Sequence, residues 1–127
     1  MKSLGRILLA FSAILLGIGA WIHTSAFSKV SAAVAKSDLN AFLGKGLKVL
    51  WLMDSTVQII LAIVFATVAI RPFAASKAVV VLLSLVLLAT AALIYDFIGN
   101  FVGGHIFLTA GVAAILGGLL RSSPQRL

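Results

Sequence analysis

Six side chains combine an ability to move protons or bind a polar group with a place inside a strongly apolar stretch. They are His23, Asp54, Gln58, Tyr95, Asp96 and His105. An imidazole beside a carboxylate can act as a general base or acid, and a neighbouring amide can orient a substrate or a water. The set therefore predicts acid–base chemistry, with Asp96, His105 and Asp54 as the candidate catalytic residues.

Helical spacing predicts which polar residues share a face. Trp51, Asp54 and Gln58 stand three and four positions apart and so lie on one side of a helix. Further side chains at matching intervals or depths complete the predicted ligand-binding set, which is His23, Gln58, Trp51, Tyr95, Thr109 and Asn100. Tyr95 points about 100° away from Asp96, towards the lipid headgroups or the edge of a pocket.

The elements that must position these residues are four apolar runs of 20 to 22 residues. They cover residues 7–27, 49–70, 78–99 and 101–120. Each run is long enough to cross a hydrocarbon core of roughly 30 Å as a helix. Backbone groups in lipid must pair within their own segment, so the prediction is an all-α, four-helix transmembrane bundle forming a single domain over residues 1–127.

The composition supports a membrane protein. Hydrophobic residues make up 62% of the chain and charged residues 10%, with a mean hydropathy of +1.22. Soluble domains carry about a quarter charged residues. There is no cysteine, which excludes disulfides, thiolate nucleophiles and Cys-type zinc sites. The net charge is +7, and the basic residues flank the apolar runs without forming a stripe. They therefore indicate membrane topology and lipid contact and not nucleic-acid binding.

Basic residues also predict the orientation. Six of them, Lys2, Arg6, Arg71, Lys77, Arg121 and Arg126, flank the two termini and the middle turn. The other four, Lys29, Lys36, Lys45 and Lys48, lie in the long first loop. The excess places both termini in the cytoplasm of a multi-pass cell-membrane protein. A cleavable signal peptide, with Val30-Ser31-Ala32 as its cleavage site, is the alternative for the first run and would remove His23.

The loop over residues 28–48 carries apolar residues at helical spacing between its lysines. One interpretation is an interfacial amphipathic helix lying over the mouth of the bundle, with Ser37 or Asp38 as the N-cap of its second half. The other is a solvated connector whose lysines contact lipid phosphates. The first interpretation gives a polar pocket a roof.

A tight turn near Asn100 and Phe101 places Asp96 and His105 at matching depth on neighbouring helices. Asp54 and His23 are expected at the same depth, so that all four helices contribute to one layer. A carboxylate in the apolar region costs about 2.5 to 3.5 kcal/mol at a helix centre, which favours inward pairing of Asp96 with His105. The alternative is that these residues reach the outer interface within an aromatic belt.

Several functions can use such a layer. The first is an enzyme that binds and converts an isoprenoid, a quinone or a sterol-like molecule. Two histidines and two aspartates could also hold a metal, and His23 with His105 a b-type haem, but there is no His-x-x-x-His or Glu-x-x-His spacing and no metal ligand is assigned. A small proton-coupled transporter is a further alternative.

The remaining hypothesis is that the protein is an accessory subunit of a larger membrane complex. Small residues favour close helix contact, within the chain, in a homo-oligomer or in such a complex. They are Gly17 and Gly19 in the first run and Gly104, Thr109, Gly111, Ala114 and Gly118 in the fourth. The expected partners are therefore membrane lipids, a lipophilic small molecule, and a second copy or a larger membrane complex.

The order of elements resembles the DoxX-like group of small four-helix membrane proteins. The similarity rests on the residues Gly5-Arg6-Ile7-Leu8-Leu9, on Arg71-Pro72, and on a long first loop followed by a close final hairpin. Members of that group are associated with quinone-linked oxidoreductase complexes or are uncharacterised. The resemblance therefore implies a membrane partner and assigns no functional residue.

Overall fold

Residues 2–121 are described by a computed structural model, and they form five helices and no strand. The helices are α1 (Lys2–Ser25), α2 (Phe27–Ala35), α3 (Ala41–Ile70), α4 (Lys77–Phe97) and α5 (Val102–Leu120). Within this range, four segments are long and apolar enough to cross a membrane: Ser3–Ala35, α3, α4 and α5. The predicted all-α fold with four membrane-length helices is confirmed.

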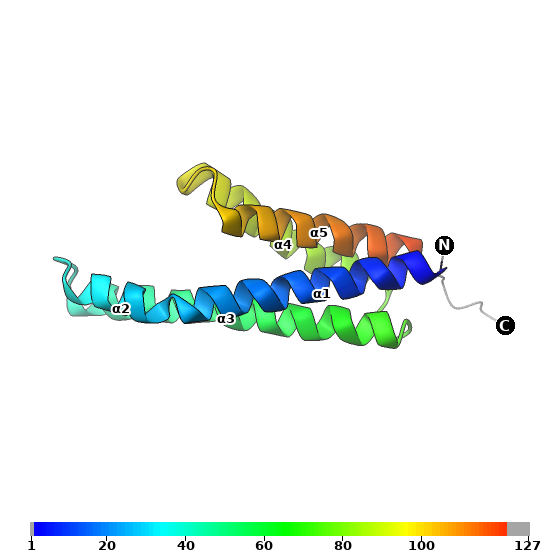
Figure 1. Ribbon diagram of the computed structural model, residues 1–127, viewed down its shortest axis with the longest axis horizontal. Coiled ribbons are helices and arrows are strands. Elements are labelled where there is room, and N and C mark those ends of the chain that lie inside the picture. Colours follow the sequence, from blue (N-terminus) through cyan, green and yellow to red (C-terminus); the bar gives the residue numbers. More distant parts are fainter. Residues whose placement is uncertain (1, 122–127) are drawn as a thin grey trace.

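Two antiparallel hairpins build the bundle (Figure 1). Helix α1 packs on α3 in one hairpin, α4 packs on α5 in the other, and the contact between α1 and α5 joins the two. The start of α1, the end of α5 and the turn between α3 and α4 lie at the same end of the bundle. The turn between α4 and α5 lies at the opposite end, and His23 and Asp54 line a cavity together with residues of this turn.

Helix α3 begins at Ala41, eight residues before the predicted start at Val49. Its N-cap is Asn40, whose side-chain oxygen accepts a hydrogen bond from the Leu43 amide at 2.9 Å. The prediction of Ser37 or Asp38 as this cap is wrong, because the chain is still turning there and the Ser37 hydroxyl donates to the Val34 carbonyl instead. The other boundaries lie within a few residues of the prediction, apart from the start of α1, which extends back to Lys2.

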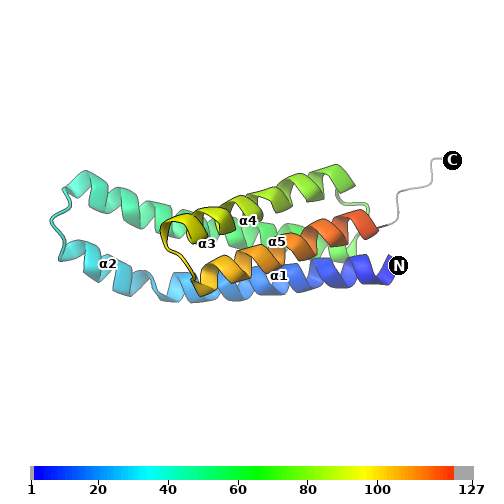
Figure 2. The same ribbon diagram turned by 90° about the horizontal axis from the view of Figure 1, so that it is seen from above.

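The predicted helix in the first loop exists as α2, but it forms no roof over the bundle. The break at Ala26 keeps a right-handed helical backbone, with φ −78° and ψ −9°, so α2 continues almost in the direction of α1. It packs against the start of α3. Helix α2, the loop after it and the start of α3, here called the arm (residues 27–48), project beyond the α4–α5 turn (Figure 2). The expectation of a covered pocket mouth is therefore wrong.

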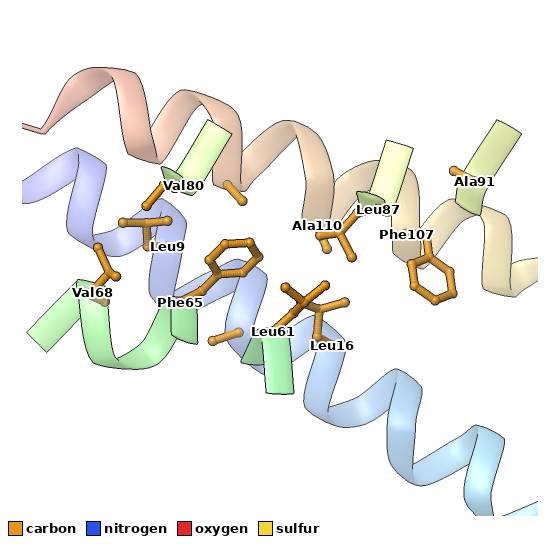
Figure 3. Packing of buried hydrophobic residues seen from close by; sticks show 13 residues of the cluster. Leu9, Leu16, Leu61, Phe65, Val68, Val80, Leu87, Ala91, Phe107 and Ala110 are labelled. Carbon is orange, nitrogen blue, oxygen red and sulfur yellow. The ribbon is translucent and has the colours of Figure 1, made fainter. Parts of the chain in front are cut away.

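Large aliphatic and aromatic side chains fill the centre of the bundle (Figure 3). Leu9 and Leu16 of α1, Phe65 of α3, and Val80 and Leu87 of α4 are completely or almost completely buried. Because both hairpins contribute to this cluster, burying it stabilises their association. Because α1 contributes Leu9 and Leu16 to this core, cleavage of the first run as a signal peptide would expose the core.

Glycines let helix α5 approach its neighbours closely. Gly117 faces α1, where an added Cβ would lie 2.9 Å from the Gly5 carbonyl oxygen and 3.1 Å from the Leu9 amide nitrogen. Gly104, Gly111 and Gly118, seven residues apart, face α4 side chains in the same way. Gly17, also predicted to mediate close contact, has nothing within 4 Å of such an added Cβ.

Basic side chains close the end of the bundle opposite the α4–α5 turn. Arg6 Nε donates to the Ala69 carbonyl at 2.7 Å, and Lys77 Nζ donates to the Leu119 carbonyl at 3.1 Å. The Arg121 guanidinium donates to the carbonyls of Pro72 and Ala75 in the turn between α3 and α4. Cations at helix C-termini satisfy free carbonyls and oppose the helix dipole. These residues thus stabilise the fold besides flanking the spans.

Candidate functional site

A cavity of about 310 Å³ lies between the two hairpins, near the α4–α5 turn. One wall is polar and comes from α1 and α3. It consists of His23, Trp51, Asp54 and Gln58, with Gly19, Ile22 and Ala26 beside them. The facing wall, from α4, α5 and their turn, is mostly apolar and consists of Thr90, Ile94, Ile98, Phe101, Val102, Gly103, Ile106 and Phe107.

The spacing in α3 positions the polar wall. Trp51, Asp54 and Gln58 share one face of the helix and all line the cavity, as their i, i+3 and i+7 positions predict. His23 lies in the last turn of α1 and faces them across the first hairpin. Four of the nine predicted site residues are therefore brought together.

Asp54 is the centre of the polar wall. Its Oδ2 accepts a hydrogen bond from Gln58 Nε2 at 2.7 Å and lies 3.6 Å from His23 Nε2. The Asp54 side chain is 33% exposed and that of His23 is 24% exposed, whereas Gln58 is 2% exposed. Both the Asp54 carboxylate and the His23 imidazole line the cavity and are partly exposed. The buried Gln58 amide holds the carboxylate through its hydrogen bond.

The His23 ring is held from two sides. It stacks on the Trp51 indole with ring centroids 3.9 Å apart and planes inclined by 10°, and its Nδ1 lies 2.9 Å from Ser55 Oγ. The Trp51 indole N–H also donates to the His23 carbonyl at 2.9 Å. These contacts fix the imidazole with Nε2 towards Asp54.

Ser55 defines the protonation of the ring. Ser55 is 4% exposed, and within residues 2–121 its hydroxyl has His23 Nδ1 as its one hydrogen-bond partner. If Nδ1 carried the proton, the buried hydroxyl would have no acceptor for its own hydrogen, which is unfavourable. The hydroxyl therefore donates to Nδ1, and the single ring proton is on Nε2, beside the Asp54 carboxylate.

Gly19 gives the Gln58 side chain its space. A Cβ at position 19 would lie 2.6 Å from Gln58 Oε1. An ionised carboxylate only accepts hydrogen bonds, so Gln58 must turn its NH₂ group to Asp54 and its carbonyl oxygen to Gly19. That oxygen is buried and has no donor within residues 2–121. Holding Asp54 in place therefore leaves one acceptor of Gln58 unsatisfied.

A second polar cluster, here called the outer cluster, lies at the α4–α5 turn and does not line the cavity. Tyr95 Oη is 2.8 Å from His105 Nδ1, and Asn100 Oδ1 is 2.7 Å from His105 Nε2. Both ring nitrogens of His105 thus have a hydrogen-bond partner. The side chain is exposed and does not line the cavity.

The predicted pair of Asp96 and His105 is not formed. Asp96 is exposed and makes no side-chain hydrogen bond or ion pair within residues 2–121. The reason is the direction of the neighbouring residue: Tyr95 faces α5, where Gly104 leaves room for its ring, and Asp96 consequently points about 100° away. Tyr95 and Asp96 thus point about 100° apart, as predicted, but the residue that contacts His105 is Tyr95 and not Asp96.

The predicted single layer is therefore two separate groups. His23, Trp51, Asp54 and Gln58 line the cleft, and Tyr95, Asn100 and His105 form the outer cluster. Thr109 is exposed and belongs to neither. The two histidines considered for a haem lie in different groups. Within residues 2–121 no three His, Cys, Asp or Glu side chains are placed to hold a metal ion.

Four apolar helices of membrane-spanning length are compatible with an integral membrane protein, and the bundle places a partly polar cleft near one end of them. No protein-family model, curated protein or solved structure matches the chain. The resemblance to DoxX-like proteins stays a prediction.

Proposed function

We propose that the protein binds a lipophilic small molecule in the cleft between its two hairpins. The observation that carries this proposal is the contrast between the two walls: a carboxylate and an imidazole on one side, and an almost entirely apolar surface on the other. A cavity with a few convergent polar groups is the usual form of a small-molecule site. Its volume of about 310 Å³ is suited to a ligand of modest size.

The distance between His23 and Asp54 supports a ligand at this point. Nε2 and Oδ2 are 3.6 Å apart, which is longer than a good hydrogen bond of about 2.7–3.2 Å. One donor and one acceptor thus face the cavity side by side without satisfying each other fully. The polar end of a ligand can contact both while its apolar body lies against Ile94, Ile106 and Phe107.

Of the residues that line the cavity, His23 and Asp54 are placed to convert such a ligand. Their contact provides an acid–base pair, with Gln58 positioning the carboxylate and Ser55 the imidazole. Ser55 does not line the cavity and so is placed to orient His23, not to attack a ligand. For the lipophilic body of the ligand we propose an isoprenoid, quinone-like or sterol-like skeleton.

Filling the cleft tests the proposal. In the variant Ile106→Trp a bulky indole ring replaces an aliphatic side chain in the cavity. We expect a molecule that co-purifies with the wild-type protein in mild detergent to be lost from this variant. Native mass spectrometry followed by solvent extraction measures this occupancy. The matched control is Leu108→Trp, because Leu108 lies on the same helix, is 42% exposed and does not line the cavity.

Equal occupancy in wild type and Ile106→Trp would contradict the proposal. So would a wild-type protein that carries no small molecule and purifies only with a larger membrane complex. That second result would favour the function of an accessory subunit.

We also propose that the protein resides in the cell membrane with both termini in the cytoplasm. The support is that Arg6, Arg71, Lys77 and Arg121 lie at the same end of the bundle. This orientation opens the cleft towards the outer face.

The absence of cysteine makes this orientation simple to measure. A membrane-impermeant maleimide applied to intact cells should label Asp38→Cys in the arm, and should label Ala74→Cys in the α3–α4 turn only after permeabilisation. Both positions are exposed. The reverse labelling pattern would contradict the orientation and leave the cleft itself unaffected.

A further inference from the structure

We infer that the ligand of the cleft is an amphiphilic amine, bound through its protonated ammonium group at Asp54. This inference rests on the proposed function and adds the chemical class of the ligand. It is carried by the charge of the polar wall, by the protonation of His23, and by the aromatic rings around the cavity.

The first step concerns the charge of Asp54. Of the described residues that line the cavity, Asp54 is the one acidic side chain, and no Lys or Arg is among them. Within residues 2–121 its single ion-pair contact is His23. The Gln58 amide donates a hydrogen bond but carries no charge. Only a protonated His23 could therefore neutralise the carboxylate from within the described part of the chain.

The second step concerns His23. The Ser55 hydroxyl lies 2.9 Å from Nδ1, and because the buried hydroxyl has no other acceptor within residues 2–121 it donates a hydrogen bond to Nδ1, which therefore carries no hydrogen. The imidazole is then neutral, with its proton on Nε2. The polar wall consequently presents one net negative charge to a cavity whose opposite wall is apolar. A charge in such surroundings is stabilised most by an opposite charge that enters with a hydrogen-bond donor.

The third step concerns the aromatic side chains. Trp51, Phe101 and Phe107 line the same cavity. The faces of aromatic rings attract cations, and this attraction grows where water is excluded. A neutral alcohol of the same shape could also donate a hydrogen bond to Asp54, but it would gain neither the charge pairing nor the attraction of the rings.

A matched pair of probes tests the inference. 4-Phenylbutylamine and 4-phenylbutanol have the same apolar body and differ in the head group. Binding of each is measured by Trp fluorescence in nanodiscs of zwitterionic lipid, with protein-free nanodiscs correcting for partition into the lipid. We expect the wild-type protein to bind the amine at least about tenfold more tightly than the alcohol.

Variants locate the preference. Asp54→Asn keeps the shape of the side chain and its bond to Gln58, and should bring the two affinities to within about twofold, since the charge pairing is lost. Asp96→Asn, an exposed position outside the cavity, should keep the full preference of the wild type. The comparison of the two probes on wild-type protein needs no variant, so a failure of Asp54→Asn to fold leaves the main test intact.

The outcomes separate this inference from the proposed function. If amine and alcohol bind equally to the wild type and both are lost in Ile106→Trp, the cleft binds ligands but the amine class is wrong. If the affinities do not change in Ile106→Trp, or neither probe binds, the inference is overturned. A preference for the amine that persists in Asp54→Asn would also overturn it, because the charge would then lie elsewhere.

Discussion

The variant Gly117→Leu is expected to separate α1 from α5 and to destabilise the bundle by about 3 kcal/mol. At this crossing an added Cβ would lie 2.9 Å from the Gly5 carbonyl oxygen and 3.1 Å from the Leu9 amide nitrogen, both backbone atoms that cannot move aside alone. Since the contact between α1 and α5 joins the two hairpins, the loss should affect the whole fold. Thermal unfolding in detergent, followed by the fluorescence of Trp21 and Trp51, measures it.

Gly17→Leu is the matched control. Gly17 lies on α1, is exposed, and has nothing within 4 Å of an added Cβ. Its replacement should leave the stability unchanged or slightly increased, because leucine favours a helix more than glycine does. Equal unfolding temperatures for the two variants would show that the backbone contact at Gly117 does not hold the hairpins together.

The second large effect is expected for Arg121→Met. Arg121 is 4% exposed and donates hydrogen bonds to the carbonyls of Pro72 and Ala75, 49 and 46 residues away in the chain. Burial lowers the pKa of its guanidinium from the ordinary value, yet arginine remains charged at physiological pH. Removing the group leaves two carbonyls of the α3–α4 turn without this donor. We expect a loss of about 2–3 kcal/mol in the same unfolding measurement.

Arg71→Met serves as the comparison for this variant. Arg71 lies in the same turn and carries the same charge, but it is exposed and its side chain forms no hydrogen bond within residues 2–121. Its replacement should change the stability by less than about 0.5 kcal/mol. Because both variants remove one positive charge, an effect on membrane insertion would appear in both and could be recognised. An equally small effect at Arg121 would contradict a stabilising role for its two hydrogen bonds.

The number and order of the membrane-length helices could be predicted from the sequence because length and hydropathy alone impose them in lipid. The early start of α3 could not. A helix in the first loop is one of two interpretations of the sequence, but the residues just before Val49 carry two lysines and two glycines, and glycine weakens a helix. They are nevertheless helical because Asn40 caps the helix and α2 packs along it, with Gly44 beside Val34.

The polar wall illustrates what helical periodicity can predict about a site. Trp51, Asp54 and Gln58 belong to one helix, so their common face follows from spacing alone. The contact of Asp96 with His105 depended on which side of α4 meets α5. That side is determined by Gly104, Gly111 and Gly118, which bring Tyr95, Leu88 and Val80 against α5. A comparison of the glycine spacing on α5 with the polar positions on α4 could have indicated it.

Ser55 and Gly19 were not predicted as parts of the site. A single serine in a transmembrane helix usually bonds to its own backbone, as Ser84 does with the Val80 carbonyl. Nothing in the sequence distinguishes Ser55 from Ser84, since only the packing of α1 on α3 brings His23 to it. The sequence predicts Gly19 only as a small packing residue, because its role in accommodating Gln58 depends on the same contact.

The two hairpins differ in length, and this has a consequence for the surrounding bilayer. Helix α3 has 30 residues and is about 45 Å long, whereas α5 has 19 residues and is about 28 Å long. A bilayer that matches α4 and α5 leaves the arm in the headgroups and water, with Asp54 near the interface. A thicker bilayer would instead have to thin beside the short hairpin or draw Asp54 into hydrocarbon. We therefore expect hydrophobic thickness to control how readily the carboxylate meets water, and the ligand occupancy of the cleft to depend on the length of the surrounding lipid chains.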